Sequence, residues 1–160
     1  MLSDYRVIDL SDERGLLCGH VLTQLEADVI HVEPPGGRPR TATWLAYTGG
    51  SRSVELDLAG SEDRARLIAL VAGADAVVES ADPGTWERLG LGYDDLVAHN
   101  PALVWVSITP FGSDGPKAGY AATDLVVQAA AGTVDLAGPA DRAPVRTARS
   151  EEHTSELSHT

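Results

Sequence analysis

Cysteine and lysine are almost absent from this chain of 160 residues, in which Cys18 and Lys117 are the only ones. A single cysteine excludes an internal disulfide framework and a cysteine-based metal cluster, which is typical of proteins of the reducing cytoplasm. Twelve basic and 24 acidic residues give a formal net charge of −12, which argues against nonspecific binding to nucleic acid or to a membrane surface. No apolar run approaches the roughly 20 residues that span a bilayer. We therefore expect a soluble cytoplasmic protein in which a few arginines or backbone N–H groups bind any anionic ligand.

Common nucleotide and metal motifs are also missing. The stretch DLSDERGLLCG contains no G-x-G-x-x-G, and no P-loop pattern occurs in the chain. The histidines at 20, 31 and 99 are not spaced to ligate one ion, so we expect no metal site. Gly15 and Gly19 lie four residues apart, which is typical of close packing between a helix and a strand.

Short apolar stretches of strand length alternate with stretches of helical period. We expect five strands, at Arg6–Leu10, Asp28–Glu33, Ser53–Leu58, Asp75–Ser80 and Ala102–Phe111. We expect helices from about Asp12 to Glu26, over Ser61–Ala74, in two short pieces within residues 82–100, and over Asp124–Ala131. Residues 34–50 contain three prolines and four glycines and are expected to form a long loop. This order predicts a Rossmann-like α/β fold, a doubly wound and mostly parallel sheet with helices on both faces.

Ligands of such sheets bind outside the carboxyl ends of the strands, so the segments SDERG, EPPGG, ESADPG and TPFGSDG are the candidate ligand contacts. Two arginines in this acidic chain are candidates for binding phosphate. Arg52 follows the flexible TGGS, and Arg88 follows ESADPG at the start of a helix. The alternative for each is a surface ion pair, for example with Asp57 or Glu87.

Several motifs in fixed order resemble the family III coenzyme A (CoA) transferases, which include formyl-CoA and carnitine-CoA transferases and, as close relatives, the α-methylacyl-CoA racemases. They are RVIDLSDERGLLCGHVLTQLEADVIHVEPPGG, SRSVELDLAG, ADAVVESADPGTWERLGLGYDDLVAHNPALVWVSITPFGSDGP and TDLVVQAAAG. The resemblance covers about Arg6 to Arg146. It implies that residues 1–148 are the incomplete, N-terminal CoA-binding part of such an enzyme, which would be a homodimer.

The resemblance also implies site residues. Those expected to contact CoA are Arg52, Leu56, Asp57, Leu58, Ser80, Ala81 and Arg88. Ser80 and Ala81 replace the Asn and the aromatic residue of the family's V-E-N-F motif, so stacking on the adenine is not expected at that point. Asp124 matches an acidic neighbour of the reacting carboxylate.

The transferases of this family use an aspartate, which attacks the acyl-CoA thioester to form an anhydride and then an enzyme thioester that passes CoA to an acceptor acid. Racemases of the family instead use Asp and His to move the proton next to the thioester carbonyl. The key aspartate would fall at position 153, where this chain has His153. The surrounding residues, Arg149 to Thr160 (RSEEHTSELSHT), resemble the translated read-through of a sequencing adapter. We therefore expect a parent CoA transferase that uses acyl-CoA, a carboxylic acid acceptor and no metal. The present chain would be inactive, and the alternatives are a racemase-type fragment or an inert CoA-binding module.

Overall fold

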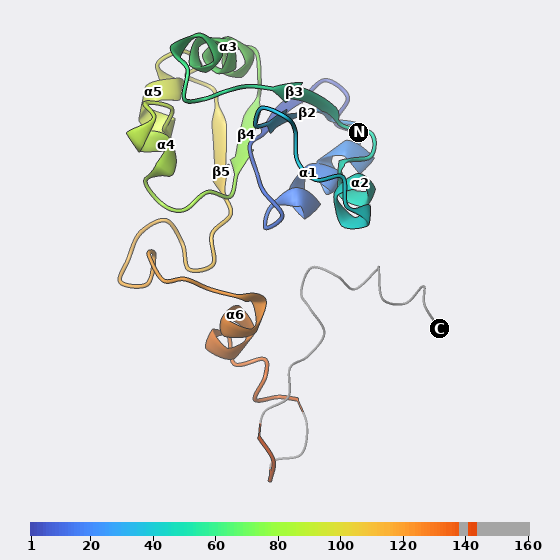
Figure 1. The fold of residues 1–160 in the computed structure, drawn as a ribbon, viewed down its shortest axis with the longest axis vertical. Helices are drawn as coiled ribbons and strands as arrows, with labels where there is room; N and C mark the ends of the chain where they lie inside the picture. The colour runs from blue at the N-terminus through green and yellow to red at the C-terminus, as the bar shows by residue number, and fades with distance from the viewer. Residues whose placement is uncertain (138–140, 144–160) are drawn as a thin grey trace. The chain divides into compact units, whose positions relative to one another are not determined.

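Five short strands form a parallel sheet in the computed structural model, which describes residues 1–137 and 141–143 (Figure 1). The strands are β1 (Arg6–Asp9), β2 (Asp28–Glu33), β3 (Arg52–Glu55), β4 (Ala76–Glu79) and β5 (Val104–Ser107). Their order is β3-β2-β1-β4-β5, and every neighbouring pair is parallel. The doubly wound parallel sheet expected from the sequence is therefore confirmed.

The chain divides into two compact units, Met1–Ala118 and a second unit that begins at Gly119. The helices of the first unit are α1 (Leu16–Gln24), α2 (Ala42–Thr48), α3 (Ser61–Ala72), α4 (Thr85–Arg88) and α5 (Tyr93–Val97). The second unit contains α6 (Asp124–Ala130). Within the described residues, no helix has both the length and the apolar composition needed to cross a bilayer.

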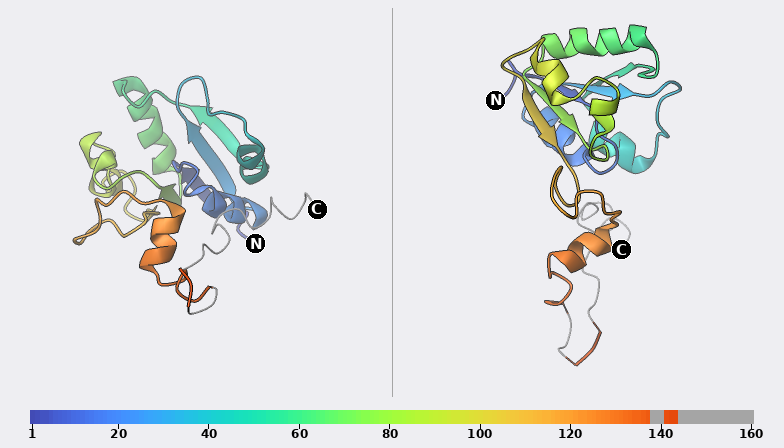
Figure 2. Two further views of the ribbon diagram at one scale, coloured as in Figure 1. Left: turned by 60° about the horizontal axis from the view of Figure 1, so that its bottom comes forward. Right: turned by 90° about the vertical axis from the view of Figure 1, so that its left-hand side faces the viewer.

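Alternate residues of the strands build two apolar layers, because successive side chains of a strand point to opposite faces of the sheet. On one face Ile8 and Val77 pack with Leu67 of α3 and with residues of α5, and this cluster is the larger part of the core. On the other face Val7, Val29 and Val78 pack with Cys18 and Leu22 of α1. Figure 2 shows α3 and α1 on opposite sides of the strands, so helices cover both faces.

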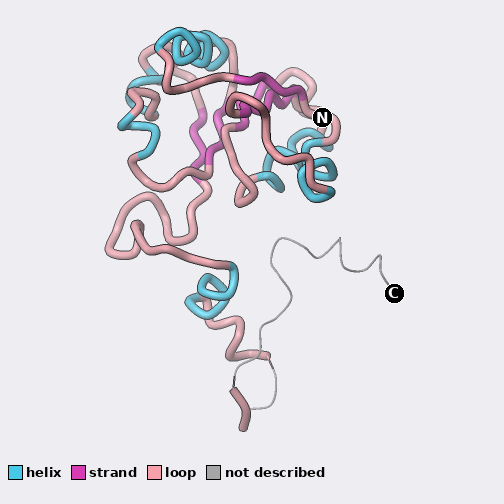
Figure 3. The backbone as a smooth tube through the Cα atoms, viewed as in Figure 1, coloured by secondary structure: helices cyan, strands magenta, loops and turns pink. Residues whose placement is uncertain are grey.

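The expectation of an unbroken loop over residues 34–50 is wrong. Residues Ala42–Thr48 form α2, which Figure 3 shows as a helix within the segment between β2 and β3. The side chain of Thr41 caps it by accepting a hydrogen bond from the backbone N–H of Trp44 at 3.1 Å. Trp44 is 3% exposed, so burial of its indole ring stabilises a helix that the prolines and glycines on either side obscured.

Except for β2, the strands are shorter than the apolar stretches that predict them. β3 ends at Glu55 rather than at Leu58, and β4 ends at Glu79 rather than at Ser80. Leu56 to Leu58 and Ser80, which were expected to end these two strands, instead follow directly after them. They therefore lie in the loops at the carboxyl edge of the sheet, where the fold class places ligands.

Candidate functional site

An open cleft with a volume of about 220 Å³ lies at the carboxyl edge of β1, β2 and β3. Its lining residues follow or end these strands, with one addition from α4: Leu10, Val32, Glu33, Pro34, Pro35, Arg38, Leu56, Asp57, Leu58 and Trp86. Three of the seven residues expected to contact CoA, Leu56, Asp57 and Leu58, are thus brought together here. The volume is below the range of about 300–1,000 Å³ that is usual for a pocket enclosing a whole drug-sized ligand. The cleft therefore fits one end of a larger molecule.

Glu33, the last residue of β2, holds one wall of the cleft. Its carboxylate is 2% exposed and accepts a hydrogen bond from the backbone N–H of Arg38 and another from Nη1 of Arg40, each at 3.1 Å. The guanidinium of Arg38 lies 5.5 Å from the centre of the Trp44 ring, within the range of a cation–π contact. These contacts hold a cation in the wall of a cleft that also contains the carboxylates of Glu33 and Asp57.

Glu79, the last residue of β4, fixes Trp86, the lining residue that α4 contributes to the cleft. Its Oε2 accepts hydrogen bonds from the backbone N–H of Ala81 at 2.7 Å and from Nε1 of Trp86 at 2.9 Å. Gly84 has a φ of +79°, a left-handed conformation that other residues adopt at a cost, and it turns the chain into α4. The turn and the hydrogen bond to Glu79 place the half-buried indole ring of Trp86 beside Leu10 and Leu56.

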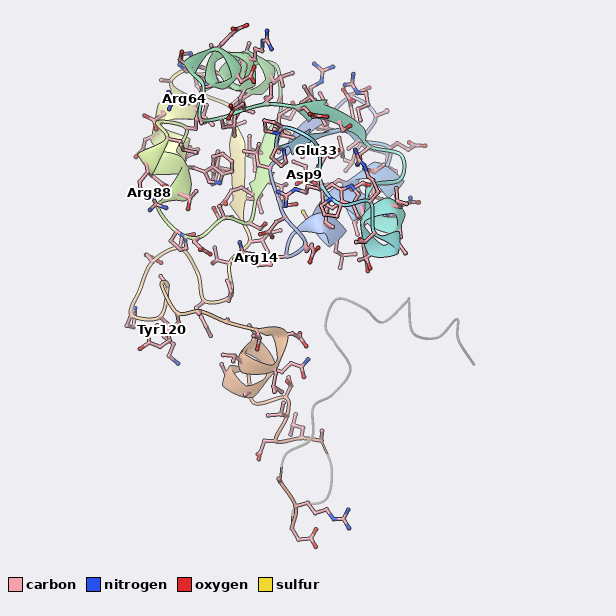
Figure 4. The ribbon with its side chains drawn as sticks, in the orientation of Figure 1. Asp9, Arg14, Glu33, Arg64, Arg88 and Tyr120 are labelled. Atoms are coloured by element: carbon pink, nitrogen blue, oxygen red, sulfur yellow. The ribbon has the colours of Figure 1, made fainter. Side chains whose placement is uncertain are left out.

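The other residues expected at the site lie outside the lining of the cleft. Ser80 is 1% exposed, and its hydroxyl is hydrogen-bonded at 2.8 Å to both the backbone N–H and Oδ1 of Asp12. Ala81 is half-buried beside it. Arg88 is exposed at the end of α4, where its Nη2 donates to Oγ1 of Thr85 at 2.9 Å (Figure 4).

Arg52 lies at the opposite edge of the sheet from the cleft, since it is the first residue of β3. Its Nη2 is 2.5 Å from both carboxylate oxygens of Asp28, which also accepts a hydrogen bond from Nε of Arg6 at 2.8 Å. Hydrogen bonds from the two arginines lower the pKa of Asp28. The structure thus places Arg52 in an ion pair, although the partner is Asp28 rather than Asp57.

Asp124 is the first residue of α6 in the second unit, and its Oδ2 accepts a hydrogen bond from Nε2 of Gln128 at 2.7 Å. His153 and the segment 149–160 lie outside the described residues. In the part of the chain that the structure describes, no three His, Cys, Asp or Glu side chains are grouped so as to hold a metal ion.

Arg38 and Trp86 are two residues of the cleft that were not singled out from the sequence. Arg38 lies in the segment 34–50, which was expected only to form a long loop, and Trp86 lies two residues after ESADPG. Their common signal is a position within seven residues of a strand's carboxyl end, five after β2 for Arg38 and seven after β4 for Trp86. That signal is shared by many residues, and only the tertiary structure separates these two from the rest.

A family comparison agrees with the resemblance derived from the motifs. The model of the family described as CoA-transferase family III matches residues 2–150. Succinyl-CoA:(R)-benzylsuccinate CoA-transferase subunit BbsE of Thauera aromatica is 39% identical over 159 residues, and the match covers 90% of this chain and 39% of that protein. Succinyl-CoA:mesaconate CoA-transferase of Haloarcula hispanica is 37% identical over 165 residues, covering 91% of this chain and 42% of the relative.

Solved structures of the same kind share the fold. The crystal structure of a CAIB/BAIF family protein from Brucella suis superposes with a TM-score of 0.83 at 36% identity, and the match covers 92% of this chain and 43% of that one. The present chain thus spans about two fifths of the length of the relatives it matches.

Proposed function

Because this chain belongs to CoA-transferase family III, we propose that the cleft beside β1, β2 and β3 binds the adenosine end of CoA. The observation that carries the proposal is the position of Leu56, Asp57 and Leu58. These are the residues that the family resemblance assigns to the nucleotide, and they line a cleft that also contains an aromatic ring and an arginine. Apolar walls with a few fixed polar groups are typical of sites that bind a planar base.

The CoA phosphates need cations. Of the arginines near this edge of the sheet, Arg14 and Arg40 are ion-paired with carboxylates, which leaves Arg38 and Arg88 among the described residues. Arg38 lines the cleft, and Arg88 lies at the end of the short helix that carries Trp86. We assign the phosphates to these two guanidinium groups, which bind phosphate oxygens through charge-assisted hydrogen bonds. Arg52 is already paired with Asp28 at the opposite edge, so the proposal gives it no direct phosphate contact. Ser80 supports the site by fixing the loop before α4, and Ala81 lies where the nucleotide passes that loop.

The reaction proposed for the whole enzyme is transfer of CoA from an acyl-CoA to a carboxylic acid. A carboxylate attacks the thioester carbonyl and forms an anhydride as the CoA thiolate leaves, and the thiolate then attacks the anhydride to form an enzyme thioester and release the first acid. The two relatives above are named for succinyl-CoA and for benzylsuccinate and mesaconate, all of which carry a carboxylate besides the carboxyl group that forms the thioester. We propose that the acyl group handled here does so as well, and that the enzyme is a homodimer, as the family resemblance implies.

The present chain has His153 where the family alignment expects the nucleophilic aspartate. Imidazole cannot form the anhydride and thioester of that mechanism in the same way, so we propose that this chain binds CoA without transferring it.

Calorimetric titration of the full 160-residue chain with CoA tests the proposal. We expect saturable binding that Trp86→Leu weakens about tenfold, since stacking of a base on an aromatic ring contributes about 1–3 kcal/mol. Trp105→Leu is the matched control, because Trp105 is also half-buried and donates through Nε1 to a side chain, Ser107 at 2.9 Å, but does not line the cleft. No heat of binding at millimolar CoA would refute the proposed site.

A further inference from the structure

The strand order contains one topological switch point, between β1 and β4. From β1 the chain continues to β2 on one side, and from β4 it continues to β5 on the other. In open α/β sheets the connections at such a point leave a crevice outside the carboxyl ends, where ligands bind. The loop between β1 and α1 (residues 10–15) and the loop between β4 and α4 (residues 80–84) border this point.

Arg14 spans the two loops. It holds Asp12 of its own loop in a bidentate arrangement, with Nε 3.1 Å from each carboxylate oxygen and Nη2 2.8 Å from Oδ2. It reaches the other loop through one contact, from Nη1 to Oδ1 of Asp82 at 3.1 Å. Figure 4 labels Arg14 among the loops at this edge of the sheet.

The two carboxylates hold Arg14 unequally. Asp12 is 34% exposed and is also hydrogen-bonded to Ser80. Burial opposes its ionisation, but the hydrogen bonds from Arg14 and Ser80 outweigh burial and lower its pKa, so it is an anion at neutral pH. The side chain of Asp82 is 83% exposed, and its one ion pair among the described residues is the one with Arg14, of a kind that contributes little.

Arg14 has N–H donors that could bind a further anion. A guanidinium has five N–H groups, and the bonds above use Nε, one N–H of Nη1 and one of Nη2. Among the described residues, the second N–H on each terminal nitrogen has no hydrogen-bonded partner. A carboxylate that replaced Asp82 would meet a guanidinium already oriented by Asp12.

We propose that Arg14 binds the free carboxylate of a dicarboxylic acyl group on CoA, which takes the place of Asp82 at the switch point. This inference rests on the proposed function and adds to it the residue that selects the acyl group. The CoA cleft and the switch point adjoin along the chain, since Leu10 of the cleft begins the loop that carries Arg14 and Trp86 of the cleft lies two residues after the loop that carries Asp82. The proposal requires the pantetheine arm of a thioester bound in the cleft to run along this edge of the sheet, so that its acyl group reaches the loops of Arg14 and Asp82.

Titration of the full chain with succinyl-CoA, butyryl-CoA and CoA tests the assignment. The two thioesters have four-carbon acyl groups and differ by the terminal carboxylate. We expect succinyl-CoA to bind about tenfold more tightly than butyryl-CoA, as one bidentate charge-assisted contact provides. Arg14→Gln reduces the ratio of the affinities for succinyl-CoA and butyryl-CoA to about one and leaves the affinity for CoA unchanged.

Asp82→Asn is the second variant. Its side chain is exposed, so the fold tolerates the change, and removal of the competing carboxylate increases the preference for succinyl-CoA. A merely structural role of Arg14 does not predict that increase. Arg6→Gln is the matched control, since Arg6 is also ion-paired with an aspartate but lies at the amino end of β1, and it leaves the ratio unchanged.

The outcomes separate the two proposals. If CoA and butyryl-CoA bind and succinyl-CoA binds no more tightly, the role of Arg14 is refuted while the CoA cleft stands. If Asp82→Asn weakens the preference for succinyl-CoA, the exchange of carboxylates is refuted. If none of the three ligands binds, the proposed function fails, and the assignment of Arg14 fails with it.

Discussion

The carboxylate of Asp9 occupies the space that a side chain at position 19 would need. A Cβ atom placed on Gly19 would meet Oδ2 of Asp9 far inside any normal contact distance. Asp9 is 2% exposed, and its other oxygen accepts hydrogen bonds from the backbone N–H and the hydroxyl of Ser11, at 2.9 and 2.6 Å. Nδ1 of His31 on β2 lies 3.3 Å from the same Oδ2, though not in hydrogen-bonding geometry. Close packing of α1 on β1, expected from the glycine spacing, is therefore confirmed at Gly19.

Gly19→Ala should destabilise the fold by about 1–3 kcal/mol, the usual effect of adding a methyl group to a filled interior. The methyl group would displace a carboxylate that is held by Ser11 and enclosed by the core. Urea unfolding followed by circular dichroism measures the change. Gly119→Ala is the matched control, since no atom lies within 4 Å of its added Cβ. Equal stability of the two variants would show that α1 can move away from β1 at no cost.

Asn100 links the end of α3 to the start of β5 by hydrogen bonds, and its replacement should destabilise the first unit. Its Nδ2 donates to the backbone oxygens of Val71 at 3.1 Å and Ala74 at 2.6 Å, and its Oδ1 accepts from the N–H of Ala102 at 3.2 Å. We expect Asn100→Ala to lower the free energy of unfolding by about 1–3 kcal/mol, because partly buried carbonyl groups lose their donors.

Asn100→Asp separates the donors from the acceptor. An aspartate keeps the oxygen that faces Ala102 but brings a negative charge to the two carbonyl oxygens. Both variants should therefore be destabilised in thermal or urea unfolding at neutral pH. Wild-type stability of Asn100→Asp would show that the contact to Ala102 is the only one that matters.

Asp28 should make stability depend on pH in the acid range. Its pKa is lowered from 3.8 in the folded state by hydrogen bonds from Arg6 and Arg52, so the folded state favours the ionised form. This stabilisation is complete above about pH 4 and is lost as the pH falls through the lowered pKa. Urea unfolding at several pH values should show a difference between wild type and Asp28→Asn of at most about 1 kcal/mol near neutral pH, because the pair is partly exposed. The difference should shrink below pH 4, and one that grew there would contradict this account.

The sequence predicted the order of strands and helices well because local patterns determine them. Periodic apolar residues mark α3, and runs such as DVIHVE mark β2 with both of its bounds as expected. It missed α2 because a capping threonine and one buried tryptophan outweigh the flanking prolines and glycines. The burial of Trp44 depends in part on its contact with His31 of β2, which the local pattern does not reveal.

The site was harder to predict than the fold, since it depends on where each strand stops. Leu56 to Leu58 were assigned to the ligand by family resemblance, and the early end of β3 places them in the cleft. The same short strand leaves Arg52 at the opposite edge, within reach of Asp28. A sequence pattern predicts the existence of a strand better than it predicts where the strand begins and ends. The ends decide at which edge of the sheet a given residue lies.

Arg88 provides the sharpest test of how the phosphates of CoA are held. The side chain is exposed and makes one hydrogen bond, to the hydroxyl of Thr85, so Arg88→Gln should leave the fold intact. If the guanidinium binds phosphate, the variant should bind CoA about five- to tenfold more weakly in calorimetric titration, with Arg88→Lys in between, because lysine keeps the charge and loses the planar pair of donors.

Ionic strength distinguishes a phosphate contact from a change in the shape of α4. Salt screens the attraction between an exposed arginine and a phosphate, so added salt should weaken CoA binding to the wild type more than to Arg88→Gln, and the two affinities should converge. Arg64→Gln on α3 is the matched control, since it removes the same charge from another helix of the first unit and does not touch the cleft (Figure 4). If Arg64→Gln weakens binding as much as Arg88→Gln does, net charge rather than a contact at Arg88 governs the affinity, and the phosphate would then be assigned to Arg38 alone.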